Sequence, residues 1–239
     1  MPALFALPTR LAYGARSVIL NPLRCIAASV TLALGLSVAT QAPAETVIAA
    51  LGDSLTQGYG LPEAEGFVPQ LEAWLRARGH DVRLINAGVS GDTTAGGLSR
   101  IGWTLTDEVD GLIVALGGND MLRAIDPDVS RANLDGILAE ARGRGLPVLL
   151  AGMIAPGNYG PDYKARFEGM YPALADQHGA LVYPNFLAGL YNYGDTAEAV
   201  RLMQADGLHP SARGVALIVE DIGPHVERLL AEIVAGSSG

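Results

Sequence analysis

Cysteine is almost absent from this sequence: Cys25 is the one thiol among 239 residues. A chain with a single cysteine cannot close an internal disulfide, so its stability must come from packing. No Cys/His cluster and no HExxH pattern is present, and no glycine-rich P-loop is found. The sequence therefore gives no reason to expect a metal, a nucleotide or another cofactor.

Positive charge is also scarce, with 16 Lys and Arg against 25 Asp and Glu and a net charge of −9. Such a surface repels phosphate backbones and anionic membranes, which makes nucleic acid a poor partner and favours a small molecule. Aromatic residues make up only 6% of the chain, so no aromatic platform for carbohydrate is evident. No feature indicates an oligomer, and a monomer is favoured.

The first 44 residues contain three arginines but no Asp, Glu or Lys. They end in a sixteen-residue apolar run, Cys25–Thr40, followed by Ala42-Pro43-Ala44 and then Glu45. This order is typical of a secretory signal peptide, and we expect cleavage after Ala44 and export to the periplasm or medium. An uncleaved anchor is the alternative, but a spanning helix needs roughly 20 apolar residues. We therefore expect no stable membrane anchor.

Residues 45–239 contain no internal repeat or linker, which predicts a single domain. Short apolar runs alternate with amphipathic stretches in this part of the chain. Strands are expected at 46–51, 82–86, 111–116, 147–153 and 180–183, and helices at 67–78, about 97–109, 127–144 and 162–178. A last helix is expected to start after Pro210, capped by Ser211, and to run to about 234. The alternation predicts an α/β fold, a doubly wound three-layer α/β/α sandwich around a five-stranded parallel sheet. Ligands bind such sheets beyond the carboxyl ends of the strands.

Three of the strand ends carry polar or glycine residues. Ser54 follows the first strand, and its N–H would face an anion if it began a helical turn. Gly91 follows the second strand and could bring its own N–H close to a ligand. Asn119 follows the third and could donate its amide to a developing oxyanion. Each string also fits an ordinary turn, and Thr56 departs from the G-x-S-x-G elbow of α/β-hydrolases.

A fourth element, Asp206-Gly-Leu-His209-Pro210, precedes the last helix. A serine hydrolase needs a carboxylate on His Nδ1 so that Nε2 can take the serine proton. Asp206 and His209 can meet on a bent loop, and Pro210 keeps His209 extended. The loop lies at the same sheet edge as Ser54, so the sequence predicts a Ser–His–Asp triad.

The four blocks in this order resemble the SGNH (GDSL) hydrolase superfamily, and its exported arylesterase and thioesterase I/lysophospholipase branch most of all. The resemblance spans about residues 46–230 and implies the flavodoxin-like SGNH hydrolase fold. It implies Ser54 as nucleophile, His209 as general base and Asp206 as its orienting carboxylate. The implied oxyanion hole consists of Ser54 N–H, Gly91 N–H and the Asn119 amide. The implied activity is hydrolysis of short-to-medium acyl esters or thioesters through an acyl-enzyme.

Two alternatives stay open at this stage. The same triad could deacetylate cell-envelope carbohydrate, or the scaffold could be a binding protein without catalysis. Apolar residues near the expected mouth are candidates for the substrate pocket, although each fits a core equally well: Leu122, Ile125, Ile154 and Leu208. Asp53 and Asp120 flank the catalytic candidates, and we expect both to be structural, bonding the N–H groups of their own turns.

Overall fold

The computed structural model describes residues 45–192 and 196–236. The expected signal peptide, residues 1–44 with its cleavage after Ala44, lies outside the described residues. Within the described ranges, no helix combines the length and the apolar character needed to cross a bilayer.

A parallel five-stranded sheet forms the centre of the fold, with the strand order β2-β1-β3-β4-β5. Its strands are β1 (Thr46–Gly52), β2 (Val82–Gly88), β3 (Gly111–Ala115), β4 (Val148–Ala151) and β5 (Leu181–Tyr183). The sheet and its two helical layers confirm the predicted α/β class. This strand order is that of flavodoxin-like folds, whose ligands bind where the order reverses, between β1 and β3.

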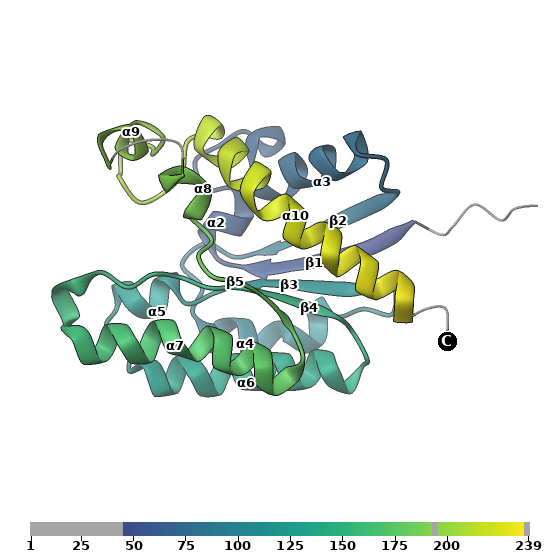
Figure 1. The fold of residues 1–239 in the computed structure, drawn as a ribbon, viewed down its shortest axis with the longest axis horizontal. Helices are drawn as coiled ribbons and strands as arrows, with labels where there is room; N and C mark the ends of the chain where they lie inside the picture. Colours follow the sequence, from purple (N-terminus) through teal and green to yellow (C-terminus); the bar gives the residue numbers. More distant parts are fainter. Residues whose placement is uncertain (1–44, 193–195, 237–239) are drawn as a thin grey trace, which may run out of the picture. The chain divides into compact units, whose positions relative to one another are not determined.

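Helices cover both faces of the sheet (Figure 1). One face carries α2 (Ser54–Gln57), α3 (Phe67–Ala77), α8 (Ala188–Tyr191) and α10 (Ala212–Gly236), with α9 (Thr196–Arg201) beside α8. The other face carries α4 (Thr94–Thr104), α5 (Gly118–Leu122), α6 (Pro127–Gly143) and α7 (Pro161–His178). Two 3-10 turns, η1 (Glu63–Glu65) and η2 (Gly157–Tyr159), precede α3 and α7.

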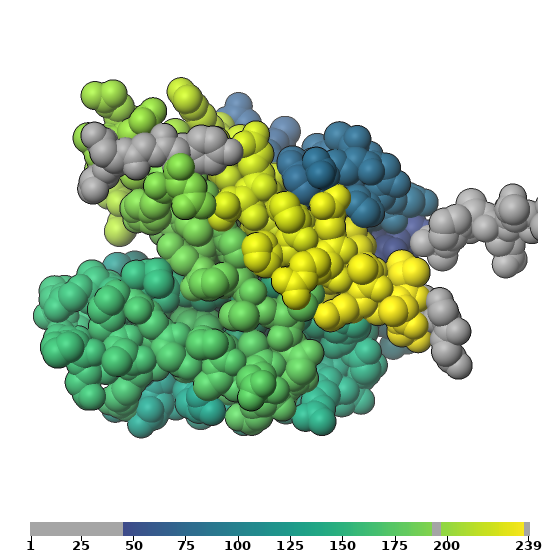
Figure 2. All heavy atoms as spheres, in the orientation of Figure 1, coloured from purple at the N-terminus to yellow at the C-terminus, as the bar shows by residue number. Residues whose placement is uncertain are grey.

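The core lies between the sheet and these two layers. Every residue of β3 is buried, with no polar alternation, because helices cover both of its faces. On α3 the apolar stripe Phe67, Leu71 and Leu75 is buried as its spacing predicts. Trp74, the fourth residue of that stripe, is partly buried, and its ring packs against Gly223, where a Cβ would come within 2.6 Å of it. Figure 2 shows α10, in yellow, lying directly beside α3.

Each predicted strand and helix is present to within a few residues, except at α4, whereas the short helices α2, α5, α8 and α9 were not among the predicted elements. We expected α4 at about 97–109, but it begins at Thr94 and ends at Thr104. It begins early because the Thr93 side chain accepts a hydrogen bond from Gly96 N–H, a side-chain cap that sets the first turn. The capping of the last helix by Ser211 is confirmed, since its hydroxyl accepts from Gly214 N–H.

The sheet register places the three strand ends of interest side by side. Gly52, the last residue of β1, is aligned with Gly88 of β2 and with Ala115 of β3. The loops that follow these residues therefore leave the sheet at one edge, and they carry Ser54, Gly91 and Asn119.

Candidate active site

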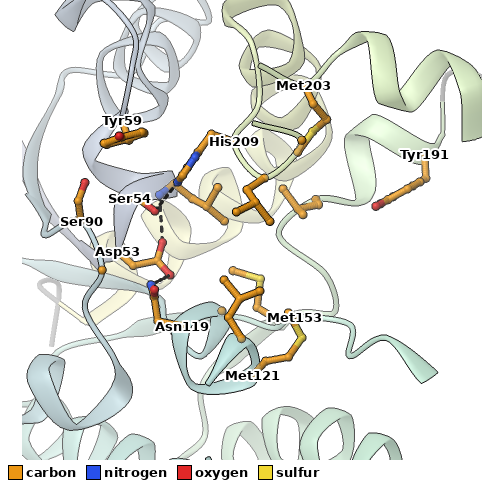
Figure 3. Close-up of a pocket in the computed structure, with 17 residues that line it drawn as sticks. Asp53, Ser54, Tyr59, Ser90, Asn119, Met121, Met153, Tyr191, Met203 and His209 are labelled. Atoms are coloured by element: carbon orange, nitrogen blue, oxygen red, sulfur yellow. Dashed lines mark hydrogen bonds between the residues drawn. The ribbon is translucent and has the colours of Figure 1, made fainter. Parts of the chain in front are cut away.

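A chain of hydrogen bonds links Ser54, His209 and Asp206. His209 Nε2 lies 2.8 Å from Ser54 Oγ, and His209 Nδ1 lies 2.7 Å from Asp206 Oδ2. Figure 3 shows the imidazole above Ser54 with its ring nitrogen directed at the hydroxyl. When Nδ1–H donates to the carboxylate, Nε2 is left as the acceptor for the serine proton. The structure thus brings together the three residues that the sequence predicts as a triad.

The Asp206 carboxylate is held by its own loop. Its Oδ1 accepts from the backbone N–H groups of Leu208, at 2.9 Å, and His209, at 3.1 Å. Gly207 between them has a φ of +66°, a left-handed conformation that suits glycine. The hydrogen bond to His209, assisted by the two backbone donors, lowers the pKa of Asp206 to about 2. Asp206 is therefore ionised at neutral pH and ready to balance a protonated imidazole.

Gln204 joins this loop to the turn that carries Tyr59. Its side-chain amide donates to Tyr59 O at 2.8 Å and to Pro210 O at 3.0 Å, and its N–H donates to His209 O at 2.7 Å. The Tyr59 ring packs on the His209 ring with a centroid separation of 4.6 Å. Neither Gln204 nor Tyr59 was predicted, because their roles depend on contacts between segments about 145 residues apart.

Ser54 begins the short helix α2, whose N-cap is Asp53. The Ser54 N–H lies in the first helical turn, where backbone donors have no partner within the helix. Gly91 has a φ of +80°, so a side chain there would be strained. Its carbonyl accepts from Arg123 Nη2 at 2.9 Å, which ties this loop to the residue that ends α5. Ser54 and Gly91, the two predicted backbone donors, both line the same cavity.

Asn119 lies in α5 and lines that cavity too. Its Nδ2 donates to Asp53 Oδ2 at 3.2 Å, while Asp53 Oδ1 accepts from Leu55 N–H at 3.0 Å. Asp53 is only 2% exposed, and this burial raises its pKa to about 6 despite those two hydrogen bonds. The expected turn contact of Asp53 is present, and the contact with Asn119 is an addition to it.

Asp120 is structural, as expected, but its partners are not in its own turn. Its carboxylate accepts from Thr94 N–H at 2.8 Å, Thr94 Oγ1 at 2.5 Å and Ser130 Oγ at 2.9 Å. These bonds join α4, α5 and α6. Asp120 thereby satisfies the first turn of α4 and holds α5 against two other helices.

A cavity of about 370 Å³ opens beside Ser54 and His209. Figure 3 shows Ser54, Asp53 and Asn119 toward one side of it, with the methionines and Tyr191 toward the other. Most of the remaining lining is apolar: Met121, Leu122, Met153, Leu187, Met203 and Leu208. Of the predicted pocket residues, Leu122 and Leu208 are in this lining. Ile125 and Ile154 are not part of it, and Ile154 is 48% exposed.

Among the residues that the structure describes, no group of three or more His, Cys, Asp and Glu side chains could hold a metal ion. The polar residues that line the cavity include Ser54, His209 and Asn119, which supply a hydroxyl, an imidazole and an amide. This set can transfer a proton from a nucleophile and stabilise a negative oxygen.

Comparison with known proteins agrees with this chemistry. Residues 50–217 match the model of the GDSL-like lipase/acylhydrolase family. Esterase TesA of Pseudomonas aeruginosa is 38% identical over 198 residues, covering 82% of this chain and 96% of that protein. The Escherichia coli protein named thioesterase 1/protease 1/lysophospholipase L1 is 29% identical over 191 residues, covering 80% of this chain and 88% of that protein.

A solved structure is similar as well. The crystal structure of AlinE4, an SGNH-hydrolase family esterase, aligns with a TM-score of 0.63 and 44% identity, covering 78% of this chain and 97% of that one. The family match spans more than half of this chain. This chain therefore belongs to the GDSL-like lipase/acylhydrolase family, and it is a carboxylic ester hydrolase.

Proposed function

We propose that Ser54 is the nucleophile of this hydrolase, with His209 as general base and Asp206 as the carboxylate that orients the imidazole. The observation that carries the proposal is the hydrogen-bonded chain from Ser54 Oγ through His209 to Asp206, with separations of 2.8 and 2.7 Å. Serine is a weak nucleophile until a base removes its proton, and His209 Nε2 is within reach of that proton.

The reaction proceeds in two steps. Ser54 Oγ attacks the acyl carbon while His209 takes the hydroxyl proton, and the protonated imidazole then passes that proton to the leaving alcohol or thiol. Water then attacks the acyl-enzyme while His209 takes one of its protons, and the imidazolium returns that proton to Ser54 Oγ as the acyl bond breaks, which releases the acid and free Ser54. In both steps the carbonyl oxygen becomes negative, and we assign its stabilisation to Ser54 N–H, Gly91 N–H and Asn119 Nδ2.

The substrate class follows from the cavity. Most of its lining is apolar and shares one cavity with the Ser54 hydroxyl, and a volume of about 370 Å³ suits a small ligand. We propose short-to-medium acyl esters and thioesters as substrates, which is consistent with the esterase and thioesterase names of the relatives. Methionine is flexible and polarisable, so the three methionines of the lining, Met121, Met153 and Met203, can adapt to acyl groups of different shape.

We also propose that residues 45–239 form the mature domain, a monomer, and that the protein is exported. The order of basic, apolar and Ala-Pro-Ala segments before Glu45 supports export. N-terminal sequencing of protein recovered from the periplasm or medium tests the cleavage, and a mature chain that starts at Glu45 is expected.

Replacing Ser54 tests the assignment. Ser54→Ala is expected to abolish hydrolysis of p-nitrophenyl esters and acyl-thioesters, and to abolish labelling by a fluorophosphonate, while the thermal unfolding midpoint stays near that of the wild type. Ser90→Ala is a matched control, because the Ser90 hydroxyl also lines the cavity but bonds Gln57 at 2.9 Å. The control should keep most activity and all labelling. Full turnover by folded Ser54→Ala would refute the proposal.

A further inference from the structure

Asp53 occupies a position that its role as a helix cap does not fully explain. Its buried carboxylate uses Oδ1 for Leu55 N–H, as an N-cap does, but Oδ2 receives Asn119 Nδ2 from another helix. This second contact requires close backbone approach, because a Cβ on Gly118 would lie 3.2 Å from Asp53 Oδ2. The carboxylate is therefore shared between the turn of the nucleophile and the amide of the oxyanion hole.

The chemistry of the two groups determines how the amide is turned. An ionised carboxylate only accepts hydrogen bonds, so it binds the NH₂ end of an asparagine and repels the oxygen end. The NH₂ group has two hydrogens. One is used by Asp53, and the other is available to a ligand in the cavity that Asn119 lines. If the amide were reversed, the Asn119 oxygen would take that place and repel a developing oxyanion.

The geometry points to Asp53 as the positioning residue that keeps the Asn119 amide turned with its NH₂ group toward the oxyanion. The inference rests on the proposed function, since the orientation matters to turnover only if Asn119 is an oxyanion donor. Asp53 itself need not touch the substrate for this role.

The charges around Asp53 support an ionised carboxylate at neutral pH. Protonated His209 attracts it, and the Arg100 guanidinium donates to the carbonyl of the preceding residue at 2.9 Å. Asp92 opposes ionisation, and the Tyr171 hydroxyl is near enough for Asp53 to raise the pKa of Tyr171. Burial raises the pKa of Asp53 to about 6, so the carboxylate is charged at pH 8 and largely neutral at pH 5.

Asp53→Asn is the informative substitution. A carboxamide has only one acceptor oxygen. In Asp53→Asn that oxygen is expected to accept from Leu55 N–H, as Oδ1 of Asp53 does, so none is left for Asn119. The NH₂ group of the new side chain then faces Asn119 and favours the reversed amide. We expect kcat to fall by about 10²–10³, as for loss of an oxyanion donor, with KM changed less than threefold.

Asp120→Asn is the matched control. Asp120 is an equally buried carboxylate next to Asn119, but its partners are Thr94 and Ser130. Its replacement is expected to lower the thermal midpoint and to leave kcat within threefold of the wild type. A similar loss of kcat in both variants would mean that any buried carboxylate here matters through packing alone, and would overturn the inference.

A double-mutant cycle with Asn119→Ala separates this inference from the proposed function. If Asp53 acts through Asn119, the double variant is no slower than Asn119→Ala alone. Losses that multiply, so that Asp53→Asn costs the same factor in both backgrounds, would overturn the positioning role and leave the oxyanion role standing. If Asn119→Ala alone has normal kcat, the oxyanion assignment itself is wrong.

The pH dependence of kcat gives a second test that does not require Asp53→Asn to fold. In the wild type the acid limb should contain a step near pH 6 from Asp53, in addition to the step that the general base His209 contributes to every variant. Asn119→Ala removes the group through which Asp53 acts, so the wild-type profile should lose one of its two ionisations in this variant and keep the other. Persistence of both ionisations in that variant would contradict the inference.

Discussion

The Gln204 side chain provides a local test of how the histidine loop is held. Gln204→Ala removes two hydrogen bonds, to Tyr59 O at 2.8 Å and to Pro210 O at 3.0 Å. Only the bond to Tyr59 O crosses from the His209 loop to the Tyr59 turn, because Pro210 belongs to the same loop as His209. At about 1 kcal/mol for that bond, the detached form of the loop should become about five times more populated.

Gln204→Glu sharpens this test. The two side chains have the same length, but a carboxylate has no donor and would face two carbonyl oxygens. We therefore expect Gln204→Glu to be more damaging than Gln204→Ala. A glutamine on α7, Gln177, donates to Asp135 at 2.6 Å far along the chain from the histidine loop. Gln177→Ala should change stability by less than about 0.5 kcal/mol, and it serves as the surface control.

The assay compares two probes during urea unfolding. Ester hydrolysis reports on the His209 loop, whereas fluorescence comes from Trp74 in α3 and Trp103 in α4, both outside that loop. In Gln204→Ala the activity should be lost at lower urea than in the wild type, while the fluorescence midpoint moves little. Normal activity and an unchanged activity midpoint in Gln204→Glu would refute the argument that this amide holds the loop.

Three further predictions follow from packing and charge. Gly223→Ala places a methyl group within 2.6 Å of the Trp74 ring, and overpacking of this kind should lower the free energy of unfolding by about 1–3 kcal/mol in chemical denaturation. Asp53 binds its proton more tightly in the folded state, with a pKa near 6 against 3.8, so its contribution to the free energy of unfolding is present below pH 3.8 and lost as pH rises through 6. The free energy of unfolding should fall by about 3 kcal/mol over this range through Asp53, and unfolding curves of Asp53→Asn measured from pH 4 to 7 should lack this decrease. Arg123→Ala frees the Gly91 carbonyl from its 2.9 Å hydrogen bond and should lower kcat up to about tenfold, with an unchanged thermal midpoint.

The strands and the triad could be predicted because they depend on local patterns and on one topological rule. Apolar runs such as that of β3 identify buried parallel strands, and the carboxyl ends of such strands meet at one edge. Ser54, Gly91 and Asn119 follow three of those strands, which is why they converge. The Asp206–His209 pair is close in sequence, so its contact could be expected from the bend at Gly207.

The lining of the cavity could not be predicted as well, because it depends on side-chain direction in the loops. Met153 lines the cavity, while its neighbour Ile154 is exposed, and both lie in the segment after β4 that belongs to no strand or helix. Ile125 follows Ala124, whose φ of +50° is a left-handed conformation that the sequence did not indicate, and Ile125 is not in the lining. Met203 and Leu187 reach the cavity from segments far away in sequence.

Asp53 and Asp120 show why the role of a polar residue can depend on its tertiary partner. Both are aspartates beside a catalytic candidate, both are at most 2% exposed, and both suit a turn. Asp120 faces hydroxyl and backbone donors of neighbouring helices, which need only an acceptor to be satisfied. Asp53 faces an amide, which can be turned in two ways that differ in the charge they present to the cavity. The same buried carboxylate therefore contributes stability alone in one place and determines the orientation of a reactive group in the other.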